Sequence, residues 1–161
     1  MKRLEDELKR FFRGFRFAAR GIVLCLRGER NFRFHVCAAL YVAAFGGLAG
    51  FSRERFALLF LCFGLMLGAE AINTAIEGLC DRATRQWEES IRNIKDIAAG
   101  AVLCCALFCV GVGVALFGDR AVWAAMGGTL ALHKGYGVLL VLGIPAALGF
   151  IFLTGREKDE D

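Results

Sequence analysis

Charged side chains gather in a few blocks along the chain, and long apolar stretches lie between these blocks. The predominantly apolar stretches are residues 36–51, 56–80, 97–117 and 136–153. A helix that crosses the hydrocarbon core of a bilayer needs about 20 apolar residues at a rise of about 1.5 Å per residue. The pattern therefore predicts four membrane-spanning helices. The segments expected to join them are a polar hinge at 52–55, a polar segment at 82–96 and a small-residue connection at 119–135.

Residues 1–35 show a different pattern, in which apolar side chains are interleaved with basic ones. Phe12 and Phe15, for example, alternate with Arg10 and Arg13. Such a mixture is typical of an amphipathic helix in the headgroup layer, with its arginines reaching phosphate groups. The basic region is too long, and too mixed with acidic residues, for a cleavable signal peptide. We therefore expect a surface helix here.

Composition supports a membrane protein. Of the 161 residues, 57% are hydrophobic and only one is proline, whereas soluble domains are usually about 45–50% apolar. This excludes a disulfide-rich secreted scaffold, a disordered chain and a soluble nucleotide-binding enzyme. The predicted fold class is all-α membrane protein, with a surface helix at 1–35, a three-span core at 36–118 and an additional span with a charged tail at 119–161.

The distribution of basic residues predicts the orientation of these spans. Sixteen of the 20 Lys and Arg residues lie in 1–35, in 82–96 or in the tail after residue 154. Basic flanks face the cytoplasm in membrane proteins, so both termini and the 82–96 segment are expected there. The net charge of +4 then indicates attraction to anionic lipid. No nucleic-acid partner is expected, because the basic block flanks a span and no soluble domain offers a groove.

The second predicted span carries polar residues that an ordinary membrane helix does not need. An ionisable residue inside a span costs about 2.5–3.5 kcal/mol on insertion scales. At about 100° per residue, the five polar side chains share one face within an arc of about 100°. These residues are Glu70, Asn73, Thr74, Glu77 and Asp81. Such a face requires either compensation by neighbouring helices or a function.

The chemistry of this face favours phosphoryl transfer. Carboxylate oxygens suit Mg²⁺, which proteins hold through one or two carboxylates together with substrate phosphates. Glu29 and the pair Lys95–Asp96 belong to other segments that meet the same cytoplasmic layer. Carboxylates for the metal, a cation for phosphate oxygens and a base for the attacking hydroxyl are the groups that phosphoryl transfer uses. The chain has no Walker motif, so a nucleotide must be held without that loop.

The polar face has three other interpretations. The polar groups can simply hydrogen-bond neighbouring helices within a bundle. A small transporter or channel, in which Glu70 and Glu77 carry protons or cations, is a second alternative. It is disfavoured because the outer halves of the predicted spans are apolar, whereas a conduction path needs charges at both depths. An assembly subunit without activity is the third, and it leaves the acidic face unexplained.

The residues also resemble a known family. Residues 70–77 read E-A-I-N-T-A-I-E, Asp81 follows, and residues 95–103 read K-D-I-A-A-G-A-V-L. This combination closely resembles the signature of the bacterial diacylglycerol kinase family, small integral-membrane lipid kinases that include the undecaprenol kinases. Residues 29–35, E-R-N-F-R-F-H, resemble the amino-terminal pattern of the undecaprenol-kinase branch. The resemblance covers about residues 10–118.

The resemblance implies a homotrimer of three-span subunits in the bacterial cytoplasmic (inner) membrane, with active sites shared between neighbouring subunits. The implied reaction transfers the γ-phosphate of ATP, with Mg²⁺, to the primary hydroxyl of a lipid alcohol, either diacylglycerol or undecaprenol. Glu70 is the implied general base, and Glu29 and Glu77 the implied metal ligands. Asn73 and Thr74 are expected beside the lipid hydroxyl.

The implied nucleotide contacts come from several segments. Lys95 and Asp96, with the asparagine of the polar face, are expected to position phosphates and nucleotide, and Arg10 to reach phosphate from the surface helix. Gln86 and Glu88 fall where some members contact the nucleoside through other residue types. The family usually ends soon after its third span, so the fourth predicted span is a departure that we expect to pack at the periphery of the trimer.

Overall fold

The computed structural model describes residues 2–84 and 86–154, with side chains described from residue 5 onward, and this part of the chain is helical without strands. The predicted all-α class is therefore confirmed. The six helices are α1 (Lys2–Gly28), α2 (Arg30–Leu48), α3 (Arg53–Ala83), α4 (Glu89–Phe117), α5 (Arg120–Leu132) and α6 (Lys134–Leu153).

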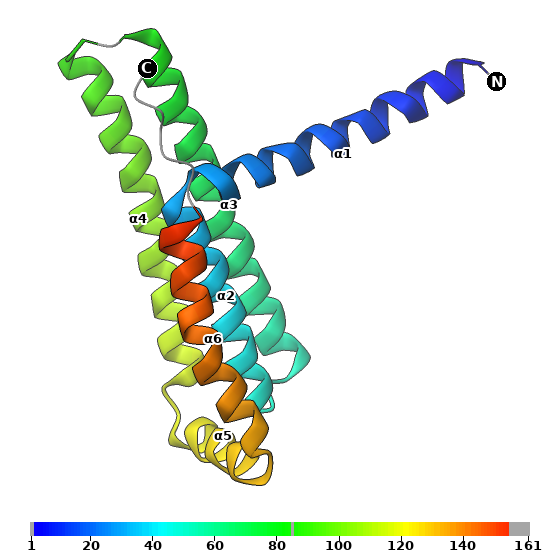
Figure 1. Cartoon of the computed structure of the whole chain (residues 1–161), viewed down its shortest axis with the longest axis vertical. Coiled ribbons are helices and arrows are strands. Elements are labelled where there is room, and N and C mark those ends of the chain that lie inside the picture. Colours follow the sequence, from blue (N-terminus) through cyan, green and yellow to red (C-terminus); the bar gives the residue numbers. More distant parts are fainter. Residues whose placement is uncertain (1, 85, 155–161) are drawn as a thin grey trace.

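Four of the helices form an elongated bundle. In Figure 1, α2, α3, α4 and α6 run along its length, and α1 projects sideways from it. Within the bundle, α3 packs against α4 and α2, and α6 packs against α2. The connection between α3 and α4 lies at one end, while the α2–α3 turn and α5 lie at the other (Figure 1). The segments that carry the predicted site thus meet at the α3–α4 end.

Three helices in the described part of the chain, α3, α4 and α6, are long and apolar enough to cross a membrane. They contain the predicted spans 56–80, 97–117 and 136–153. The remaining predicted span, 36–51, falls mainly in α2, whose first two turns carry Asn31, Arg33 and His35 and lower its hydropathy. The four-span arrangement stays a prediction.

The orientation likewise stays a prediction. The count of basic residues behind it included Arg85, Arg156 and Lys158, which lie outside the described residues.

The connection predicted for 119–135 is in fact mostly helical, which makes six helices where the pattern predicted five. Helix α5 begins after Asp119, whose carboxylate accepts a hydrogen bond from the backbone nitrogen of Ala121 at 2.9 Å. Val122 and Met126 are four residues apart and both are buried. Alanine and leucine favour a helix, and the capped end together with the buried stripe stabilises it. The small residues that suggested a loop belong to a packed helix.

Two helix boundaries also differ from the sequence pattern. The range 1–35 was expected to be one surface helix, but α1 ends at Gly28 and Glu29 is extended, with φ −112° and ψ 116°. Residues 53–55 were expected in a hinge, but they form the first turn of α3. The turn lies just before them and includes Gly50 at φ +68°, a conformation that glycine adopts without steric cost.

The buried apolar cluster lies at the end of the bundle that is remote from the predicted site. Phe51, Leu59, Leu116 and Val122 form it, and they come from the α2–α3 turn, α3, α4 and α5. Burial of such side chains contributes about 25 cal/mol per Å² of apolar area. This end therefore fixes the register of the helices whose other ends carry the acidic residues.

Candidate active site

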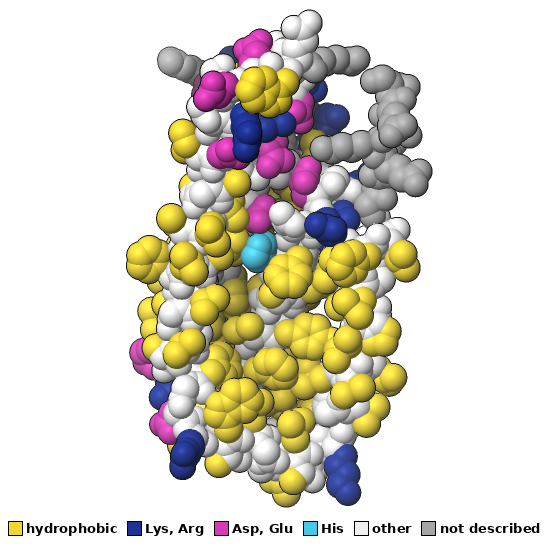
Figure 2. All heavy atoms as spheres, turned by 90° about the vertical axis from the view of Figure 1, so that its left-hand side faces the viewer, with side chains coloured by type: hydrophobic (Ala, Val, Ile, Leu, Met, Phe, Trp, Pro, Cys, Tyr) yellow, Lys and Arg dark blue, Asp and Glu magenta, His cyan; other side chains and the backbone are white. Residues whose placement is uncertain are grey.

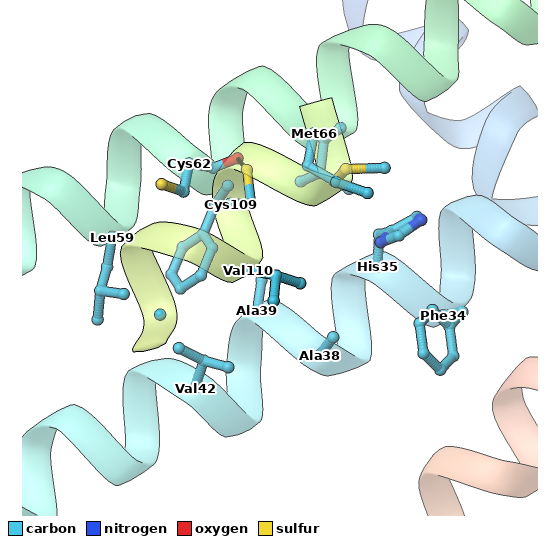
Figure 3. Close-up of a pocket in the computed structure, with 14 residues that line it drawn as sticks. Phe34, His35, Ala38, Ala39, Val42, Leu59, Cys62, Met66, Cys109 and Val110 are labelled. Carbon is cyan, nitrogen blue, oxygen red and sulfur yellow. Dashed lines mark hydrogen bonds between the residues drawn. The ribbon is translucent and has the colours of Figure 1, made fainter. Parts of the chain in front are cut away.

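Glu70 is the most buried carboxylate described, with 4% of its surface exposed. It lies on α3, and its Oε1 atom is 3.3 Å from Nε2 of His35 on α2. Figure 3 shows His35 pointing from α2 toward the side on which Met66 of α3 lies. Because a buried carboxylate is costly without a polar partner, this contact accounts for how Glu70 is accommodated between two helices.

Two further carboxylates act on Glu70 electrostatically. Glu77 lies two turns later on α3, and Glu29 lies at the break between α1 and α2, and both are close enough to repel its charge. The thiol of Cys25 is affected by two of the same carboxylates. Burial raises its pKa, and the carboxylates of Glu29 and Glu70 raise it further. The three acidic side chains predicted for the site are thus near enough to influence one another, and they come from two segments of the chain, α3 and the break between α1 and α2.

Asn73 links this acidic group to the rest of the polar face. Its Nδ2 atom donates a hydrogen bond to Oε1 of Glu77 at 2.9 Å. Its Oδ1 atom is buried and has no partner among the described residues, which leaves the desolvation cost of that oxygen uncompensated. Thr74, the next residue, is half-buried. The site therefore offers a buried acceptor to any hydroxyl or amine that enters it.

A polar cavity of about 640 Å³ lies beyond the acidic group, between the end of α3 and the start of α4. Its lining includes Gln86, Glu88, Lys95 and Asp96, so the structure gathers four of the residues predicted to contact nucleotide. The ammonium of Lys95 donates a hydrogen bond to Asp81. Asp96 faces a basic partner, since its Oδ2 atom is 3.6 Å from Nε of Arg92 in an exposed pair.

Arg10 is not brought to this cavity within the chain. It lies on α1, which leads away from the bundle (Figure 1). Its guanidinium is exposed and pairs with Glu7 at 3.4 Å. Of the residues predicted to contact nucleotide, Asn73 lies outside this cavity but on the acidic face of α3, whereas Arg10 lies on a helix that leads away from both.

An apolar cavity of about 420 Å³ lies between α2, α3 and α4, and His35 forms part of its lining. Its lining in Figure 3 includes Ala38 and Val42 of α2, Met66 of α3 and Cys109 of α4. Figure 2 shows the same division on one face of the molecule, where acidic and basic side chains gather at one end and apolar side chains cover most of the rest. The acidic group lies at the boundary between the two regions.

Sequence patterns did not single out two residues that matter to this geometry. His35 contacts Glu70, and Arg33 is almost completely buried. Both lie just before residues 36–51, the apolar stretch that the pattern assigned to the first span. Ionisable residues next to an apolar stretch were the signal that could have identified them. Their partners lie on other helices, however, and helical periodicity does not predict contacts between helices.

The fold and the site together define a class, a helical membrane protein whose buried carboxylate contacts a histidine that lines an apolar cavity. A family model described as prokaryotic diacylglycerol kinase matches residues 16–117. The chain belongs to the prokaryotic diacylglycerol kinase family. It is therefore a lipid kinase that uses ATP, as the resemblance implied, and the transporter alternative is not favoured.

Curated relatives agree with this assignment. The chain is 40% identical to the undecaprenol kinase of Bacillus subtilis over 112 residues, which cover 70% of this chain and 91% of that protein. It is 35% identical to the diacylglycerol kinase of Synechocystis sp. over 100 residues, 62% of this chain and 57% of that protein. It is 39% identical to a diacylglycerol kinase of Sinorhizobium sp. over 82 residues, 49% of this chain and 58% of that protein. No solved structure matches the chain.

Proposed function

We propose that this kinase phosphorylates the primary hydroxyl of a membrane lipid alcohol, with undecaprenol as the preferred acceptor and diacylglycerol as the second candidate. The observation that carries the proposal is the position of Glu70, which is buried and contacts His35, a residue that lines the apolar cavity. The choice of undecaprenol is supported by the Bacillus subtilis relative, whose match covers 91% of that protein.

In this proposal Glu70 is the general base. A carboxylate at this boundary is placed to accept the proton of a lipid hydroxyl while the hydrocarbon chain stays in the apolar cavity. Asn73 supports the arrangement, because its Oδ1 atom, which has no partner among the described residues, can accept a hydrogen bond from a water molecule beside that hydroxyl. Thr74 lies beside it on the polar face.

Glu29 and Glu77 would hold Mg²⁺ together with the phosphates of ATP. The described residues contain no group of three metal-binding side chains that could hold the ion on their own. Two carboxylates completed by substrate phosphates and water are nevertheless a common arrangement for this ion, and Asn73 holds the Glu77 carboxylate in place. When bound, Mg²⁺ would supply positive charge to the phosphate oxygens during transfer.

The polar cavity would hold the nucleotide. Lys95 would exchange its bond to Asp81 for a bond to a phosphate oxygen, and Asp96, Gln86 and Glu88 would line the rest of the site. Arg10 fits this scheme only if it comes from another subunit, since α1 leads away from its own bundle. A homotrimer in the bacterial inner membrane, with sites shared between neighbours, would bring it there.

The test is phosphate transfer from MgATP by the purified chain, assayed separately with undecaprenol and diacylglycerol. Glu70→Gln should lower the rate about 10²–10⁴-fold while the helical content is kept, because the amide cannot accept the proton. Glu29→Gln and Glu77→Gln should raise the Mg²⁺ concentration that gives half the maximal rate.

The matched control is Glu54→Gln, an exposed glutamate in the first turn of the same helix at the remote end, which should leave the rate unchanged. Full activity of Glu70→Gln would overturn its role as the base. If the parent chain transfers phosphate to neither alcohol, the proposed acceptors are wrong.

A further inference from the structure

Arg33 is a buried cation that the proposed reaction does not use. Only 3% of its surface is exposed. Its Nε and Nη2 atoms donate hydrogen bonds to the carbonyl oxygen of Ile151 at 3.1 and 2.9 Å. Its Nη1 atom donates to the carbonyl oxygens of Leu26 and Arg27 at 3.1 and 3.3 Å. All four bonds go to backbone oxygens, and in the described part of the chain Arg33 forms no ion pair with a carboxylate.

These backbone oxygens belong to the carboxyl ends of two helices. Leu26 and Arg27 lie in the last turn of α1, and Ile151 lies in the last turn of α6. The last four carbonyls of a helix have no partner within it and form the negative end of its dipole. A guanidinium carries five donors in a rigid fork. Arg33 therefore joins α1 and α6 by capping both of their ends.

A second contact reaches α6 from the same turn of α2. The guanidinium of Arg30 lies 5.8 Å from the ring centroid of Phe152, within range of a cation–π interaction. Farther along, the hydroxyl of Tyr41 donates to the carbonyl oxygen of Leu140 at 3.1 Å. Helix α6 is thus held against α2 at its middle and at its carboxyl end, as its course beside α2 in Figure 1 also shows.

Glu29 lies between the segments that Arg33 holds. Its backbone nitrogen donates to the carbonyl oxygen of Cys25 at 2.9 Å, and its own carbonyl accepts from the backbone nitrogen of Arg33 at 3.2 Å. Because Glu29 is the one extended residue between α1 and α2, the angle between these helices decides where its carboxylate points. The contacts of Arg33 fix that angle.

We propose that α6 acts as a strut, whose carboxyl end holds the α1–α2 junction through Arg33 and so keeps the Glu29 carboxylate beside Glu70. The inference rests on the proposed function only for the metal-binding role of Glu29. Arg33 and Ile151 are then positioning residues. The family match ends at residue 117, so the strut is an addition to the family core that serves the same reaction.

The experiment uses the full chain and two readouts. Hydrogen exchange of peptides covering residues 25–33 reports the junction, and the Mg²⁺ concentration for half-maximal rate reports Glu29. Arg33→Met removes all four hydrogen bonds. Ile151→Ala keeps the guanidinium and the backbone carbonyl that it binds, but it removes a buried side chain (6% exposed) and so loosens the packing of the α6 end that carries this carbonyl. Both variants should speed exchange at the junction about tenfold and raise the Mg²⁺ requirement severalfold, with the KM for the lipid alcohol unchanged.

Two further variants serve as controls. Leu153→Ala makes the same kind of change on α6, but at a side chain that is 83% exposed, and it should alter neither readout. Arg33→Lys keeps a charged donor and should restore part of the protection that Arg33→Met loses.

Unchanged exchange at 25–33 in Ile151→Ala and Arg33→Met overturns the strut, whatever the activity. Faster exchange with an unchanged Mg²⁺ requirement overturns its link to Glu29. If Arg33→Met does not fold, Ile151→Ala decides by the same two criteria. If the parent chain shows no kinase activity, the proposed function fails while the exchange experiment still decides whether α6 holds the junction.

Discussion

The contact between Glu70 and His35 joins α3 to α2 at the most buried point of the site. The two side chains are 3.3 Å apart, and 6% of the carboxylate side chain and 21% of the imidazole are exposed. A partner at this distance restricts the rotamer of Glu70, and small errors in the placement of a base lower the rate of transfer. In the proposed reaction His35 is therefore a positioning residue for Glu70.

We predict that His35→Leu lowers kcat about tenfold, because the carboxylate loses the group that orients it. The KM for ATP should not change, since the nucleotide cavity does not include this residue. Steady-state kinetics with each substrate varied in turn would measure both constants. His133→Leu alters an exposed histidine at the far end of the bundle and should behave like the parent chain. An unchanged kcat in His35→Leu would contradict the positioning role.

The acidic face could be predicted from the sequence because it lies on one helix. Glu70, Asn73 and Glu77 follow the helical period, so their common face needs no knowledge of the fold. The partner His35 could not be derived in this way, because which residue of α2 faces Glu70 depends on how the two helices pack. The orphaned oxygen of Asn73 is likewise visible only once its neighbours are in place.

At the scale of helices, α6 lies close to α2 at Gly143. A Cβ atom at this position would lie 2.8 Å from the hydroxyl oxygen of Tyr41, which is shorter than any ordinary contact. The same hydroxyl donates to the carbonyl oxygen of Leu140. The absence of a side chain at Gly143 is therefore what lets the two helices lie this close.

We predict that Gly143→Ala destabilises the chain by about 1–3 kcal/mol through overpacking. Adding Tyr41→Phe should recover part of the loss, because it removes the atom that clashes. Thermal unfolding in detergent would measure all three variants against the parent. Gly149→Ala is the control on the same helix, since a Cβ atom there meets nothing within 4 Å. Equal stability of Gly143→Ala and Gly149→Ala would show that the close approach does not constrain the packing.

The long apolar helices could be predicted from composition, whereas the breaks between helices could not. Predicted spans 97–117 and 136–153 end at or next to the last residues of α4 and α6, because runs of apolar residues mark these helices directly. The break at Glu29 follows Gly28, but Gly14 and Gly21 lie inside the same helix, so a glycine alone does not mark the break. The break depends on Arg33 capping α1 from outside, which is a tertiary effect that local propensity does not report.

At the scale of the whole molecule, the course of α1 makes a test of shared sites possible. One chain contributes Glu70 and the polar cavity, but its Arg10 lies on a helix that points away (Figure 1). In a trimer with shared sites, two differently damaged chains can supply each other's missing group. Such a trimer would have a mass three times the 17.6 kDa of one chain.

We predict that Arg10→Ala and Glu70→Gln chains, each of low activity alone, recover activity when they are unfolded and reassembled together. Some mixed sites would then combine an intact Arg10 with an intact Glu70. The measurement is the transfer rate of the mixture against the rates of the separate variants, with native mass spectrometry to count subunits. A mixture of Glu70→Gln and Glu77→Gln is the contrasting case, because both residues lie on α3 of one chain and should belong to one site. Equal rates from both mixtures would contradict the sharing of Arg10.

The position of the apolar cavity also indicates the route by which the proposed lipid acceptor enters the site. The cavity lies between α2, α3 and α4, and in the described part of the chain α2 and α4 each pack on α3 without touching one another, so we expect its entrance to face hydrocarbon and not water. For an acceptor that diffuses within the bilayer, the rate of phosphate transfer depends on its mole fraction in the lipid. At a fixed bulk amount of alcohol, adding inert detergent should therefore slow the turnover, whereas the dependence on ATP should follow its concentration in the aqueous phase.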